Sequence, residues 1–106
     1  MKAATLSALA EPNRLQIVEL LREGPHTVGE IADGLRIHQP QASKHLKVLS
    51  EAGIVEVRPE ANRRYYRLRP EPLKEIDEWL ASFRGMEDRV DRLVDYLNEL
   101  NNGGRG

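Results

Sequence analysis

The sequence predicts a mainly α-helical fold that carries one small β-hairpin, and three observations support this class. Apolar residues recur at helical spacing through most of the 106 residues. Two short segments, 54–58 and 65–69, alternate apolar and polar side chains around turn-forming residues. The length suits one domain, and 40% hydrophobic with 31% charged residues is typical of a soluble globular protein.

Composition excludes several classes of protein. The chain has no cysteine, so it has no disulfide framework and no thiolate metal site. No apolar run approaches the ~20 residues of a membrane span, and the first residues lack the apolar block of a signal peptide. We therefore expect a cytoplasmic protein without a membrane partner.

Charge is distributed unevenly along the chain. Residues 1–35 carry a net charge of −2, residues 36–69 a net charge of +5, and residues 70–106 a net charge of −4. The overall charge of −1 therefore conceals a basic middle segment between acidic flanks. This distribution is typical of an anion-binding surface on a neutral scaffold.

Three short helices are expected before residue 36. The first covers residues 1–9, and Pro12 is well placed to begin the second. Thr27 is a plausible N-cap for the third helix, and Glu30 three residues later completes a capping box. A short connector leads from the third helix into the segment that follows.

Residues 39–53 predict a helix with one narrow apolar stripe. Pro40 suits a first helical turn and Gly53 suits a helix end. The stripe consists of Ala42, Leu46 and Leu49. The exposed side chains are of types that bond base edges and phosphates in a major groove, namely Gln39, Gln41, Ser43, Lys44, His45 and Lys47.

A basic β-hairpin follows this helix. Residues 59–62 supply turn chemistry between the two strand segments, and Asn62 can adopt a left-handed conformation. Two short helices joined by few residues match a helix-turn-helix, and the added hairpin makes a winged helix. The hairpin carries five arginines, which are Arg58, Arg63, Arg64, Arg67 and Arg69.

A long apolar seam marks the C-terminal part of the chain. Apolar residues recur every three or four positions from Ile76 to Leu100, a near-heptad pattern. Gly85 interrupts the pattern, which leaves open a kink or two shorter helices. A small winged helix cannot cover so long a stripe, so we expect a second copy to meet it. The residues of this seam expected in the dimer interface are Trp79, Phe83, Met86, Val90, Leu93 and Leu97.

The chain is thus divided into three expected parts. Residues 1–84 form a winged helix-turn-helix DNA-binding domain. Residues 85–100 extend the C-terminal dimerisation helix, and residues 101–106 form a disordered tail.

At this point the chain resembles the ArsR/SmtB family of dimeric winged-helix repressors over residues 4–84. The motifs are ALAEPNRLQIVELL (8–21), TVGEIADGL (27–35), QPQASKHLKVLSEAGIV (39–55) and NRRYYRL (62–68). The resemblance implies a homodimer whose first and last helices form the interface, which adds Leu6 and Leu9 to the expected dimer interface. It also implies recognition helices in successive major grooves, wings along the backbone, and release from the operator by a signal.

The family's DNA contacts, carried over by position, fall on Gln39, Gln41, Ser43, Lys44 and His45, and its wing contacts on Arg63 and Arg64. His38 stands where the family usually has a capping serine, and Asn62 replaces a common wing-tip glycine. The family's thiolate ligands would fall at Thr27 and Gly29, which cannot hold a soft metal. The family's other metal site uses histidine on the last helix, and none follows His45. We therefore expect no metal and no cofactor.

The chemistry of the side chains suggests individual roles. Gln39 and Gln41 can pair bidentately with adenine, and Ser43 can reach a base edge or a phosphate. Lys44 and Lys47 are expected to bind phosphate, which gives affinity rather than sequence choice.

Three residues keep two interpretations each. His45 either contacts DNA or packs against the scaffold through a hydrogen bond. His38 either caps its helix or meets DNA. Arg14 either reaches the DNA backbone or forms a structural salt bridge.

The sequence therefore predicts a homodimeric, sequence-specific transcriptional regulator of the repressor type. Helix 39–52 reads the major groove and the 58–67 wing follows the backbone or minor groove of a palindromic operator, under control of an unknown small-molecule or protein effector. One alternative is a protein-interaction adaptor that uses the 76–100 seam, and another is a sensor with an oxygen and nitrogen metal site. An enzyme is not expected, because Ser43 and His45 are two residues apart on a helix and point in different directions.

Overall fold

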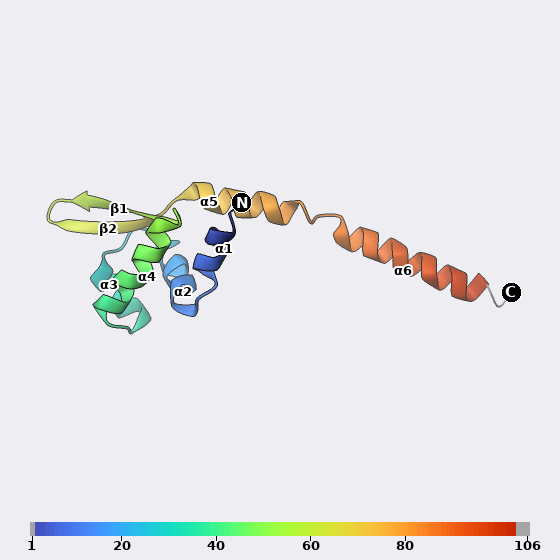
Figure 1. Cartoon of the computed structure of the whole chain (residues 1–106), viewed down its shortest axis with the longest axis horizontal. Coiled ribbons are helices and arrows are strands. Elements are labelled where there is room, and N and C mark those ends of the chain that lie inside the picture. The colour runs from blue at the N-terminus through green and yellow to red at the C-terminus, as the bar shows by residue number, and fades with distance from the viewer. Residues whose placement is uncertain (1, 104–106) are drawn as a thin grey trace. The chain divides into compact units, whose positions relative to one another are not determined.

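The computed structural model describes residues 2–103 and has the predicted order of helices and hairpin (Figure 1). Contacts divide the chain into two compact units that meet between Ile76 and Asp77. The elements are α1 (Ala3–Leu9), α2 (Pro12–Leu21), α3 (Val28–Leu35), α4 (Gln39–Glu51), β1 (Val55–Glu60), β2 (Arg63–Leu68), α5 (Pro70–Ala81) and α6 (Met86–Gly103).

Helices α1 to α4 enclose a single hydrophobic core, and the hairpin projects from them (Figure 1). Complete burial of each large aliphatic side chain stabilises the fold by about 1.5–3 kcal/mol relative to exposure. Tyr66 and Leu68 of β2 pack against this core, which anchors the base of the hairpin. The largest fully buried side chains are Ile17, Ile31, Leu46, Leu49 and Ile54.

Caps at both ends of α3 fix its connection to α4. The Thr27 hydroxyl accepts the Glu30 N–H at 3.2 Å, and the Glu30 carboxylate accepts the Thr27 N–H at 2.9 Å, so the predicted capping box is confirmed. Arg36 ends the helix in a left-handed conformation with φ of +58°. The Ile37 N–H then donates to the Ala32 carbonyl at 3.0 Å, closing a Schellman motif.

The two strands pair antiparallel, from Val55 opposite Leu68 to Glu60 opposite Arg63. They are therefore displaced from the expected 54–58 and 65–69, because the turn takes only two residues. Asn62, which can adopt a left-handed conformation, does not do so here: the left-handed residue of the turn is Ala61, with a φ of +54°. Ala61 is the first residue of a two-residue loop, where the twist of a hairpin favours positive φ.

Two helices carry the C-terminal seam, which settles the alternatives left open at Gly85. Helix α5 ends at Ala81 and α6 begins at Met86. Gly85 has a φ of +89°, and the N–H groups of Phe83 and Arg84 bond three residues back rather than four. The expected division of the chain at residue 84 falls within this break.

Helix α6 continues to Gly103, so the expectation of a disordered tail from residue 101 is wrong for residues 101–103. No glycine or proline lies between Met86 and Asn102, and the helix therefore propagates to the first glycine. Residues 104–106 of that predicted tail lie outside the described residues. Among residues 2–103, no helix has the length and apolar character needed to cross a membrane.

Candidate nucleic-acid interface

The N-terminus of α4 is held by hydrogen bonds around His38. The carbonyl of His38 accepts the N–H groups of Gln41 and Ala42 at 3.0 and 3.1 Å. The side-chain oxygen of Gln41 accepts the His38 N–H at 3.1 Å, which is the reverse half of a capping box. His38 thus occupies the N-cap position, and the Gln41 amide oxygen is engaged in the capping hydrogen bond.

Helix α4 separates a buried stripe from a polar surface. The predicted stripe of Ala42, Leu46 and Leu49 is fully buried, which fixes the rotation of the helix about its axis. Pro40 lies in the first turn, as expected. The predicted DNA contacts that remain exposed on this helix are Gln39, Gln41, Ser43, Lys44 and Lys47.

His45 differs from the other predicted contacts of α4, because its side chain is only half-exposed. Its Nδ1 lies 3.6 Å from the Glu11 carboxylate, which also accepts the Arg14 N–H at the start of α2. This geometry favours the packing interpretation of His45. The Arg14 side chain donates to the Ala8 carbonyl and so ties α2 to α1. Among residues 2–103 no carboxylate forms an ion pair with Arg14, and its contact with the DNA backbone stays a prediction. Glu11 was not predicted as part of the site, although its position before Pro12 is a helix-start signal.

Three of the five arginines near the wing form ion pairs. Arg67 and Arg58 approach the Glu56 carboxylate at 2.5 and 3.7 Å. Arg69 approaches Glu71 at 3.7 Å. In the part of the chain that the structure describes, no carboxylate lies within salt-bridge distance of the two predicted wing contacts, Arg63 and Arg64. Both are exposed at the start of β2 and are free to meet an anion.

The predicted dimer residues divide between the two units. On α1, Leu9 packs partly against the core and Leu6 is exposed. The six C-terminal residues are all exposed, from 41% for Trp79 to 57% for Leu93. The rings of Trp79 and Phe83 pack edge to face with centroids 5.2 Å apart. An exposed apolar stripe of this length is typical of an interaction surface.

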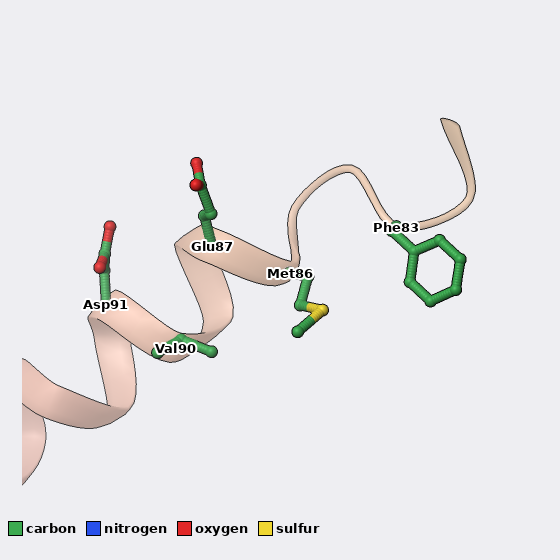
Figure 2. A pocket seen from close by; sticks show the side chains of 5 residues that line it. All are labelled: Phe83, Met86, Glu87, Val90 and Asp91. Carbon is green, nitrogen blue, oxygen red and sulfur yellow. The ribbon is translucent and has the colours of Figure 1, made fainter. Parts of the chain in front are cut away.

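The apolar side chains of α6 are separated from its acidic ones. A hollow of about 430 Å³ at the start of α6 is lined by Phe83, Met86, Glu87, Val90 and Asp91. In Figure 2 the side chains of Met86 and Val90 point away from those of Glu87 and Asp91. This segregation leaves an apolar surface that another helix can cover.

Within residues 2–103, no three His, Cys, Asp or Glu side chains come together as metal ligands would. The positions that correspond to the family's thiolate ligands, Thr27 and Gly29, lie at the start of α3 beside Gln39. That this chain does not sense metal stays a prediction.

The chain is similar to known transcriptional regulators. A family model described as a helix-turn-helix domain matches residues 9–58. The HTH-type transcriptional regulator Rv2034 of Mycobacterium tuberculosis is 40% identical over 89 residues, covering 79% of this chain and 83% of that protein. The biofilm growth-associated repressor of Agrobacterium fabrum is 42% identical over 89 residues, covering 83% and 76%.

Solved structures agree with these relatives. The crystal structure of a possible transcriptional regulator for arsenical resistance has a TM-score of 0.69 and 38% identity, and the match covers 89% of this chain and 96% of that one. A homodimeric winged helix-turn-helix DNA-binding domain from Mycobacterium bovis, described as a possible ArsR-family regulator, has a TM-score of 0.65 and 33% identity, with 77% and 79% covered.

The fold and the polar face of α4 define the class of winged helix-turn-helix DNA-binding regulators. Within this class the chain belongs to the ArsR family of transcriptional regulators, as its sequence resemblance indicated. Helix α4 is therefore the recognition helix and the β1–β2 hairpin is the wing. The family consists of DNA-binding regulators rather than enzymes.

Proposed function

We propose that this protein is a homodimeric repressor that binds a palindromic operator and leaves it in response to an effector. The observation that carries this proposal is the exposed polar N-terminal face of α4, mounted on three buried residues. Ser43 and Lys44 lie on that face, and such side chains bond bases and phosphates. The unpaired wing arginines add sequence-independent affinity.

The first test replaces the exposed hydroxyl and ammonium groups of the recognition helix. Ser43→Ala with Lys44→Ala is expected to abolish operator binding, because it removes polar contacts without touching the core. Ser50→Ala with Lys74→Ala is the matched control and should bind as the wild type does. Electrophoretic mobility shift on a duplex that the wild type selects from a random pool measures both. Wild-type affinity in the first double variant would show that α4 is not the reading surface.

The dimer is supported by the spacing of the apolar seam. Its members are Ile76, Trp79, Phe83, Met86, Val90, Leu93, Leu97 and Leu100, which alternate steps of three and four. In the sequence this spacing continues through the break between α5 and α6, so each of the two helices presents part of the seam. An apolar seam of this kind packs against a helix with a matching seam. A second copy of this protein carries such a helix and is always present in solution.

Sedimentation tests the dimer. Leu93→Glu is expected to yield a monomer, because it places a carboxylate in the apolar seam. Asp95→Ala, on an exposed position of the same helix, should stay dimeric. A wild-type protein that sediments as a monomer would contradict the dimer and favour the adaptor, for which the exposed seam is the supporting observation.

A further inference from the structure

A shallow groove lies where the recognition helix, the helix before it and the wing converge. Its volume is about 330 Å³. Three of its residues open α3, one opens α4 and two begin β2, so it brings together the starts of three elements. The lining residues are Thr27, Val28, Gly29, Gln39, Arg63 and Arg64.

The side chain of Gln39 lies across the first turn of α3. A Cβ atom added to Gly29 would come within 3.3 Å of the Gln39 Nε2. Gly29 has no positive φ that would require glycine, and glycine inside a helix costs about 1 kcal/mol relative to alanine. The room that Gly29 leaves is therefore occupied by the carboxamide of Gln39.

The groove presents hydrogen-bond donors. Arg63 and Arg64 contribute two guanidinium groups without an ion-pair partner among residues 2–103, and Gln39 contributes its amide N–H₂. The Thr27 oxygen accepts the Glu30 N–H, which leaves its own O–H free to donate. Several donors with net positive charge suit a phosphate oxygen.

The Glu30 carboxylate lies at the same end of α3 as this groove. The Glu30 side chain accepts the Thr27 N–H, and this hydrogen bond, with smaller contributions from the charges of His26 and Arg63, holds the pKa of the Glu30 carboxyl below its usual range. Glu30 is therefore ionised at neutral pH. It opposes the binding of a further anion while it caps α3.

The amide of each glutamine of α4 lies beside another part of the protein. A bidentate contact with adenine uses both the oxygen and the nitrogen of the amide. The Gln41 oxygen already accepts the His38 N–H, and the Gln39 nitrogen lies beside Gly29 in the groove. Sequence choice is then left to other side chains of α4, such as Ser43.

We propose that the groove seats one backbone phosphate of bound DNA, which Gln39, Arg63 and Arg64 contact, with Gly29 and Glu30 as positioning residues. This rests on the proposed DNA-binding function and assigns Gln39 to the backbone rather than to a base. The phosphate would join the recognition helix to the wing, so that both enter the duplex in one register.

Affinities on a duplex selected by the wild type, and on its single-base-pair variants, test this assignment. Gln39→Ala should lower affinity by the same factor, about ten-fold, on every duplex. Gly29→Ala should lower affinity by part of that factor, because its methyl group would lie 3.3 Å from the Gln39 Nε2 and push the carboxamide by a few tenths of an ångström. Gln16→Ala, an exposed glutamine of α2, is the matched control and should have no effect.

Salt dependence and charge give a second readout that does not depend on Gln39. Arg63→Ala should reduce the slope of log affinity against log salt by about one. Glu30→Gln keeps the capping box, since glutamine also completes it, and should raise affinity roughly two-fold at low salt. Circular dichroism checks that each variant keeps its helices.

Two results would overturn the groove assignment. The first is that Gln39→Ala flattens the preference at one base pair by about five-fold to 150-fold, which is the signature of a base contact. The second is that Gln39→Ala, Arg63→Ala and Glu30→Gln all bind as the wild type does, while Ser43→Ala with Lys44→Ala still abolishes binding. Failure of the wild type to bind any duplex would instead refute the proposed function itself.

Discussion

Replacing Ala61 with glycine is expected to stabilise the protein. Ala61 has a φ of +54° at the wing tip, where its Cβ approaches the following carbonyl and costs about 1–2 kcal/mol. Glycine removes this strain but loses about 0.5–1 kcal/mol more backbone entropy on folding than alanine. The net gain is about 0.5–1 kcal/mol, which corresponds to a rise in Tm of about 2–8 °C for a domain of this size.

Thermal and urea unfolding, followed by circular dichroism, measure this gain. Asn62→Gly is the matched control, because Asn62 is not among the residues with positive φ and glycine there adds only entropy cost. We expect that control to be neutral or destabilising by about 0.5 kcal/mol. If Asn62→Gly stabilised the protein and Ala61→Gly did not, the turn would have the conformation that the sequence alone suggested.

Three further variants probe the core, the helix break and the wing. Leu46→Ala should lower the free energy of unfolding by about 2–5 kcal/mol, because Leu46 is 1% exposed. Val48→Ala on the same helix is the control: Val48 is 38% exposed, so this change should lower the free energy of unfolding by well under half as much. Urea titration measures both. Gly85→Ala should raise the helix content, since alanine opposes a φ of +89°. It should also keep the dimer, because the spacing of the seam in the sequence continues through the break. Loss of the dimer in sedimentation would contradict this. The Arg67 hydrogen bond holds the pKa of Glu56 below its usual range, so the stability that Glu56 adds is present above the ordinary carboxyl pKa and is lost as pH falls through the lowered value. Glu56→Gln should therefore flatten the acid side of the stability profile, and an unchanged profile would show that this pair does not matter.

Local signals in the sequence predicted most of the fold. Helix α4 was expected at 39–52 and is observed at Gln39–Glu51, because an apolar stripe, Pro40 and Gly53 all agree on one helix. The capping box of α3 was equally local, since both partners lie within one turn. Agreement between periodicity and end signals is what makes such helices predictable.

Features that depend on distant residues were not predictable in the same way. His45 packs toward Glu11, which is far away in the sequence, so the pattern of α4 alone does not distinguish a DNA contact from a scaffold contact. The left-handed residue of the wing depends on strand register, which is set by the pairing of Glu60 with Arg63 and not by the preferences of Asn62. The neighbourhood of Gln39 and Gly29 likewise exists only once α3 and α4 are placed together.

The most direct test of the central claim is selection of duplexes by the wild-type protein from a random-sequence pool, followed by salt titration of the enriched sequence. A dimer that places α4 in successive major grooves predicts an inverted repeat with half-sites about 34–36 Å apart, centre to centre. Six to ten phosphate contacts predict a slope of log affinity against log salt of about −5 to −9. An enriched pool with no repeat, or a slope near zero, would contradict DNA recognition by paired recognition helices and wings.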